Sequence, residues 1–115
     1  MITTSIGKQA EAAVTKELKR QGYKIIDQNW KTAICEIDIV AKKDKVLYFV
    51  EVKCRSGSAQ GGGLEYIGPQ KLKRLHFAAR VWVQNHNFDG DYRILGASVS
   101  TNGLIYSVDE IVEIE

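Results

Sequence analysis

Two acidic residues and a lysine near the middle of the chain have the types and spacing needed to hold a metal ion. Asp38 lies in a β-branched run, residues 36–41, and Glu51 and Lys53 lie in a second apolar run, residues 46–55. Carboxylate oxygens are the ligands that Mg²⁺ or Mn²⁺ prefers. Such an ion would activate water and polarise a phosphate, and Lys53 would position that water or offset developing charge. The pattern predicts a hard-cation site whose metal would act on a phosphoryl group.

A β-hairpin over residues 34–55 would bring these side chains together. Its two apolar runs flank a polar turn at Asp44-Lys45, and side chains alternate faces along a strand. Glu51 and Lys53 should therefore share a face, as should Glu36 and Asp38. A turn centred on Asp44-Lys45 would place Asp38 opposite Glu51. The apolar residues would divide in the same way, with Ile37 and Ile39 on one face and Val40, Leu47 and Phe49 on the other.

A simpler interpretation of the acids remains open. Charged groups on buried strands persist when they are paired with one another or bound to metal. Glu36, Asp38, Glu51 and Lys53 could thus form a cross-strand salt-bridge cluster without any ligand. The double change Asp38→Asn with Glu51→Gln would then be tolerated or even stabilising.

Several segments in a fixed order resemble the YraN-like family of small bacterial proteins. Asp38 and Glu51-Val52-Lys53 match the PD-(D/E)xK signature of a nuclease superfamily to which this family and the archaeal Holliday-junction resolvases are related. The resemblance covers roughly residues 5–85. The matching segments are 7–13, 22–26, 29–31, 36–41 and 49–55.

This resemblance implies a restriction-endonuclease-like fold and a Mg²⁺- or Mn²⁺-dependent endonuclease that cuts DNA, with branched structures such as Holliday junctions among its substrates. Asp38, Glu51 and the Val52 carbonyl would hold the metal, Lys53 would assist the attacking water, and Glu11 would complete the acidic site. A homodimer is implied, because resolvases cut two strands symmetrically. Phosphate contacts would come from Arg55, Gln70, Lys71, Lys73 and Arg74.

The sequence departs from the family pattern at two places. An acid expected near residue 95 is absent, since the chain reads Arg93-Ile94-Leu95, and the usual glycine before Glu36 is Cys35. Neither change touches Asp38, Glu51 or Lys53, so the predicted site residues stand.

A helix over residues 5–21 should carry Glu11 toward the sheet. Ile6, Ala10, Val14 and Leu18 recur at helical spacing, and Glu11 lies beside this apolar stripe. Thr4 or Ser5 can cap its start and Gly22 can end it. Glu11 is then either a rim residue paired with a lysine or a further acid of the metal site.

Other elements follow in order along the chain. We expect a strand over 23–26, a bend at 27–29, and a helix from Pro69 to about His86 whose basic first turn carries Lys71, Lys73 and Arg74. Strands should span 92–100 and 104–108 around a turn at 101–103, with 109–115 an edge strand or helical turn. The Gly-rich segment 56–63 is either a loop that closes over substrate or a loose connector.

The order α-β-β-β-α-β-β predicts an α/β fold with a mixed central sheet flanked by helices, in a single domain over residues 1–115. The formal net charge of +2 permits nucleic-acid binding without requiring it. No apolar run is long enough for a membrane span and no signal peptide is recognised, so we expect a cytoplasmic protein without a membrane partner.

The remaining reactive or aromatic side chains favour structural roles. Cys35 and Cys54 would face each other across the hairpin, away from Asp38, and two buried thiols are favoured over a disulfide. Trp30 is expected in the core rather than stacked on a base. The two histidines, ten residues apart, do not have the spacing of a helical zinc pair.

A second class of function remains open from the sequence alone. A nuclease-like fold can serve as a non-catalytic nucleic-acid-binding or assembly module, because fold does not fix function. Binding of divalent ions would separate the two possibilities, since the module needs none.

Overall fold

A computed structural model describes residues 5–56 and 67–114 of the chain. Within these residues, two helices and five strands follow one another in the predicted order. The elements are α1 (Ile6–Arg20), β1 (Lys24–Lys31), β2 (Glu36–Lys43), β3 (Val46–Ser56), α2 (Pro69–Asn85), β4 (Tyr92–Thr101) and β5 (Tyr106–Glu113).

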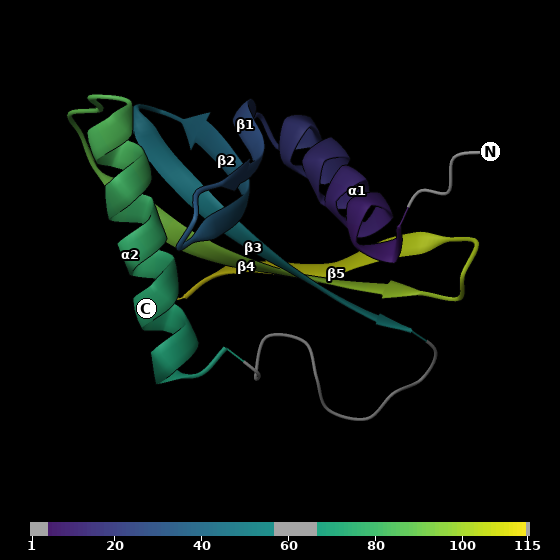
Figure 1. Cartoon of the computed structure of the whole chain (residues 1–115). Helices are drawn as coiled ribbons and strands as arrows, with labels where there is room; N and C mark the ends of the chain where they lie inside the picture. The colour runs from purple at the N-terminus through teal and green to yellow at the C-terminus, as the bar shows by residue number, and fades with distance from the viewer. Residues whose placement is uncertain (1–4, 57–66, 115) are drawn as a thin grey trace.

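The strands form one mixed sheet in the spatial order β1-β2-β3-β4-β5, with β3 and β4 parallel and the other neighbours antiparallel. Figure 1 shows α1 and α2 on either side of this sheet. The parallel pair requires a crossover connection, and α2 supplies it. The predicted α/β class, element order and mixed sheet are confirmed.

Two hydrophobic layers cover the sheet, one under each helix. The first joins Val14 and Leu18 of α1 to Ile39, Val50 and other residues of the sheet. In the second, α2 packs on β2, β3 and β4 through Leu75, Ala78, Ala79, Trp82, Val40, Leu47, Phe49 and Ile94. The central strands are therefore buried on both faces, as the apolar residues of the hairpin predict.

The ends of both helices follow the expected capping. The Ser5 side chain accepts a hydrogen bond from Lys8 N at 3.2 Å, and Gly22 follows α1 with φ of +96°, a value that favours glycine. Gly68 precedes α2 and Pro69 occupies its first turn. One detail differs from the prediction: Ile6, placed in the apolar stripe, is 54% exposed.

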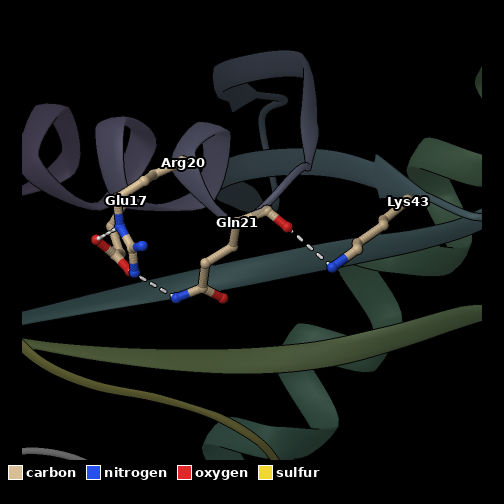
Figure 2. A network of polar contacts seen from close by, with 4 residues as sticks. All are labelled: Glu17, Arg20, Gln21 and Lys43. Carbon is tan, nitrogen blue, oxygen red and sulfur yellow. Dashed lines mark hydrogen bonds and ion pairs between the residues drawn. The ribbon is translucent and has the colours of Figure 1, made fainter.

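The C-terminal end of α1 is tied to the sheet by the polar network in Figure 2. Lys43 Nζ donates to the Gln21 carbonyl oxygen at 2.9 Å, and Gln21 Nε2 donates to Glu17 Oε2 at 2.6 Å. Lys43 Nζ also lies 5.0 Å from the centroid of the Tyr23 ring. A cation at a helix C-terminus is electrostatically favourable, so Lys43 fixes the orientation of α1 and of the residues it carries.

We therefore expect Lys43→Ala to lower the free energy of unfolding by about 1–2 kcal/mol, because both the carbonyl bond and the cation–π contact are lost. Urea unfolding followed by circular dichroism measures the effect. Lys16→Ala, at an exposed position of α1, makes the same change of charge and should cost less than about 0.5 kcal/mol. Equal effects of the two variants would show that the network contributes nothing.

The first strand is longer than predicted. β1 runs from Lys24 to Lys31, so residues 27–29 are strand and the predicted bend is wrong. The cause is an irregularity that the strand absorbs: its register against β2 shifts between Ile25 and Asp27, and Asn29 has φ of 51°. A bulge bends a strand without ending it.

The C-terminal hairpin also differs slightly from its prediction. β5 begins at Tyr106 instead of 104 and continues to Glu113, which makes most of 109–115 an edge strand, one of the two alternatives. The connecting turn is longer because Asn102 Oδ1 accepts hydrogen bonds from Leu104 N and Ile105 N, each at 2.9 Å. The Gly-rich segment from residue 57 onward, Thr4 and Glu115 lie outside the described residues.

Candidate acidic cleft

Asp38 lies where the central hairpin stops pairing. The turn falls at Asp44-Lys45, as predicted, with φ of 51° and 70°. The β2–β3 ladder keeps the predicted register from the turn as far as Ile39 opposite Val50, and ends there. The predicted pairing of Asp38 with Glu51 is therefore wrong. The Asp38 carboxylate instead accepts a hydrogen bond from Val52 N at 2.8 Å.

The side-chain alternation of β2 changes at the same residue. Ile37 packs in the layer under α2, whereas Ile39 packs in the layer under α1, so the prediction that they share a face is wrong. The neighbouring strand shows a related irregularity, because Asn29 has a left-handed conformation between the pairs Gln28–Ile39 and Trp30–Ile37. Asparagine tolerates this conformation better than most residues. The two strands thus distort together around Asp38.

Three further carboxylates, Glu51, Glu11 and Glu36, act electrostatically on Asp38. Burial is the main cause that raises the pKa of Asp38, to about 7, and the charges of Glu51, Glu11 and Glu36 raise it further, against the Val52 hydrogen bond. Burial also raises the pKa of Glu11, against the stabilising effect of the Asn29 side chain. Glu11 Oε1 is buried and accepts no hydrogen bond from the described residues. Glu36 and Glu51 form ion pairs with Lys31 and Lys71, whereas Asp38 and Glu11 form none with a described residue, so a cation between these two acids would relieve their repulsion.

The acids approach from both layers of the fold. Glu11 comes from α1 and lies within hydrogen-bonding reach of Asp38. Glu51 belongs to the regular part of β3, and its Oε2 forms an ion pair with Lys71 Nζ of α2 at 3.0 Å. Lys53, two residues beyond Glu51, is exposed and shares its face of the strand. Among residues 5–56 and 67–114, no three His, Cys, Asp or Glu side chains are close enough together to hold a metal.

A cleft of about 580 Å³ opens beside Glu51. One wall is the first half of α2 and the other is the β1–β2 turn with its flanking residues. Four predicted DNA-contacting residues, Gln70, Lys71, Lys73 and Arg74, line it together with Lys31, Thr32, Ile34, Cys35, Glu36, Glu51, Leu75 and Phe77. Arg55 is not among these lining residues; it is partly buried farther along β3. Four of the five residues predicted to contact phosphate thus lie around one cavity.

The structure separates the two cysteines. Cys35 packs against the layer under α2 and Cys54 against the layer under α1, and both are free and partly buried. The prediction that they face each other is wrong because the change of face at Asp38 moves Cys35 to the other layer. Trp30 packs partly buried against the α2 layer, as expected of a core aromatic residue.

Asn29 is a candidate site residue that the sequence did not reveal. Its side chain stabilises the charged form of Glu11, and it belongs to the distorted segment opposite Asp38. Nothing in the local sequence indicates a left-handed residue inside a strand. A non-glycine residue in that conformation is strained, and such strain clusters at functional sites.

The ionisation of Asp38 should couple stability to pH. Its pKa of about 7 in the folded protein exceeds the value of roughly 4 expected for an unfolded chain, so between these values the folded state binds more protons. Without divalent ions, this carboxyl should therefore remove on the order of 2–3 kcal/mol of unfolding free energy as the pH rises from about 4 to about 7.

Asp38→Asn isolates this contribution, because asparagine can still accept the Val52 hydrogen bond but cannot ionise. Urea unfolding at several pH values measures both proteins. As the pH rises, the unfolding free energy of the variant should increase relative to that of the wild type. Above neutrality the variant should be the more stable protein. Parallel pH profiles of the two proteins would contradict the assignment.

The class of this protein is a mixed five-stranded α/β fold in which a partly buried carboxylate lies where β2 and β3 stop pairing, beside a basic cleft. The model of the uncharacterised protein family UPF0102 matches residues 10–99, and the chain belongs to this family, which corresponds to the YraN-like resemblance. No described helix is long and apolar enough to cross a membrane.

Relatives from distant bacteria show the extent of the similarity. A UPF0102 protein of Anaeromyxobacter dehalogenans is 39% identical over 82 residues, which cover 71% of this chain and 61% of that relative, so the match spans less than two thirds of its length. A UPF0102 protein of Thermotoga maritima is 38% identical over 97 residues, which cover 84% of this chain and 88% of the relative. One from Vibrio vulnificus is 35% identical over 85 residues, with 74% and 70% covered.

Proposed function

We propose that this protein is a metal-dependent endonuclease that hydrolyses DNA phosphodiester bonds, with branched DNA as a substrate. The observation that carries the proposal is the pair of neighbouring acids, Asp38 and Glu11, without an ion-pair partner among the described residues, next to a cleft lined by cations. Purely structural clusters gain by pairing their charges. Asp38 has no ion-pair partner among the described residues, and its ionisation lowers the stability of the folded protein. The PD-(D/E)xK resemblance of the same residues supports the assignment.

The donor set fits a hard cation. Asp38, Glu51 and the Val52 carbonyl would hold Mg²⁺ or Mn²⁺, because these ions prefer oxygen ligands. Glu11 beside them has a buried oxygen, Oε1, that accepts no hydrogen bond from the described residues. When bound, the ion would supply Lewis acidity toward a phosphoryl oxygen and a water of lowered pKa. The described residues contain no group of three acidic side chains close enough to hold a metal. The proposed ligand set does not need one, because it consists of two carboxylates and one backbone carbonyl.

Other residues would position the attacking water, Asp38 and the DNA phosphates. Lys53 would orient the attacking water and offset charge on the phosphate, since it shares the face of Glu51. Glu11 would hold Asp38 in place from α1. Lys71 neutralises Glu51 in the structure and is 45% exposed, so it can exchange that carboxylate for a phosphate oxygen. Lys73 and Arg74 would hold neighbouring phosphates, which fix the position of a duplex without reading its sequence.

A cleavage panel tests the proposal directly. Junction, flap, gapped, single-stranded and linear duplex DNA, together with an RNA of the same sequence, are incubated with the full chain in Mg²⁺, Mn²⁺ or EDTA. We expect cleavage of DNA that needs the ion and is fastest on branched substrates. Absence of cleavage on every substrate in both ions would refute the nuclease proposal.

A homodimer is part of the same proposal, because symmetric cutting of two strands needs two sites. Light scattering of the free protein and of its complex with a junction measures the assembly. A complex that contains a single copy of the chain on each junction would rule out paired cutting.

One observation favours a second function, a non-catalytic nucleic-acid-binding or assembly module. Glu51 is occupied by Lys71, and that ion pair alone would satisfy the carboxylate without any metal. Titration with Mg²⁺ distinguishes the two functions. A nuclease site should show a rise in melting temperature that Asp38→Asn abolishes, whereas a module should show the same response in both proteins.

A further inference from the structure

The cleft beside Glu51 is not a purely ionic surface. Phe77, at 40% exposure, and Ile34, at 74%, line it from opposite walls, α2 and the β1–β2 turn. Two such side chains facing each other across one cleft give an apolar partner a surface to cover, and covering them is favourable because it removes apolar area from water. A phosphate group can bind the cations of the cleft, but it has no apolar face with which to cover Phe77 and Ile34.

Polar, basic and apolar residues follow one another along a single face of α2. Gln70, Arg74 and Phe77 are separated by four and three residues, so they lie along one face of the helix and all three line the cleft. Phe77 is therefore one turn beyond the last cation. This is the order in which a nucleotide presents its charged phosphate and its flat base.

The charge of the cleft identifies the partner as an anion with an apolar part. Four cations, Lys31, Lys71, Lys73 and Arg74, face two carboxylates. Lys31 pairs with Glu36 at 3.8 Å and Lys71 with Glu51 at 3.0 Å, while neither Lys73 nor Arg74 has an ion pair with a described residue. The volume of about 580 Å³ lies in the range of roughly 300–1,000 Å³ that small-ligand sites occupy.

From this geometry we infer that the cleft takes one unpaired nucleotide of a DNA substrate, with its base against Phe77 and its phosphates on Lys73 and Arg74. Ile34, at the tip of the opposite wall, acts as the wedge that keeps the base out of the duplex stack. Aromatic stacking tolerates any base, so the cleft selects DNA by the presence of an unpaired position and not by sequence. This inference deepens the proposed nuclease function and rests on it for the choice of DNA.

Binding measurements without cleavage test the inference. A duplex carrying a short single-stranded gap, with 2-aminopurine at the unpaired position, is compared with the fully paired duplex of the same sequence, in EDTA. Fluorescence anisotropy gives the two dissociation constants, and 2-aminopurine emission reports stacking. We expect wild-type protein to prefer the gapped DNA and to quench the probe.

Phe77→Ala should reduce affinity for gapped DNA about tenfold, with little change for the paired duplex, and should abolish quenching. Phe77→Tyr keeps the ring and should behave as wild type, which controls for damage to the fold together with the melting temperature. Leu104→Ala removes an even more exposed apolar side chain, at 88%, in the turn between β4 and β5, and should change neither affinity.

The phosphate contacts give a contrasting result. Removing Lys73 and Arg74 together should weaken binding to both DNA molecules by a similar factor and reduce the salt dependence of each. The inference fails if Phe77→Ala binds gapped DNA as the wild type does, if it loses both DNA molecules equally, or if the probe is never quenched.

The outcome is separable from that of the nuclease proposal. Phe77-dependent binding of gapped DNA without any cleavage would support this cleft assignment and refute the enzyme. Metal-dependent cleavage with no effect of Phe77 on binding would support the enzyme and refute the cleft assignment.

Discussion

Replacing Lys53 with alanine is expected to slow Mg²⁺-dependent DNA cleavage by about a hundredfold or more while leaving the protein folded. Lys53 is exposed and lies two residues beyond Glu51 on the regular, parallel-paired part of β3. Its ammonium group would act on the water and on the charge that develops at the phosphate, so the loss should fall on the single-turnover rate and not on DNA affinity.

The measurement is single-turnover cleavage of a junction with protein in excess, together with thermal unfolding. Lys24→Ala removes an exposed lysine at the start of β1 and serves as the matched control. Asp38→Asn, purified in the same way, should be equally inactive, which excludes a contaminating nuclease. A Lys53→Ala protein that cuts at the wild-type rate would remove Lys53 from the mechanism.

The second large effect concerns the anchor of α2. Trp82 is 3% exposed, lies edge-to-face against Phe49 with ring centroids 5.7 Å apart, and stacks on His86 at 3.8 Å. Its indole nitrogen donates to Asp27 Oδ2 at 3.1 Å, so one side chain joins α2 to β3 and to the edge strand β1. Trp82→Ala should cost about 3–5 kcal/mol of unfolding free energy.

Chemical unfolding of the purified variant measures this loss. Trp82→Phe keeps an aromatic ring but removes the donor to Asp27, and its cost should be smaller, about 1–3 kcal/mol. A cost below about 1 kcal/mol for Trp82→Ala would contradict the described packing, because truncations of buried aromatic residues rarely cost so little.

Periodic segments were predictable from the sequence because local physics determines them. The spacing of Ala10, Val14 and Leu18, with Ser5 before them and Gly22 after them, placed α1 correctly. Alternation about Asp44-Lys45 gave the hairpin and its register up to Ile39. In both cases a buried face and a turn residue agree, and a shift of register would expose the core.

The irregular details of the site were not predictable. The left-handed Asn29 and the loss of pairing at Asp38 change which layer the flanking residues face, and they account for the errors at Ile37 and Cys35. Lys71 and Glu51 were identified separately, as a phosphate contact and a metal ligand. Their ion pair depends on how α2 crosses the sheet, which no local pattern specifies.

The parallel pairing of β3 with β4 has a consequence for how the protein is made. β3 carries Glu51 and Lys53, yet one of its two neighbours, β4, begins only at Tyr92. Contacts between residues so far apart in sequence form slowly, because a long loop must close first. During translation, the strand bearing the acid and the lysine therefore keeps one open edge until β4 has been synthesised and can pair with it.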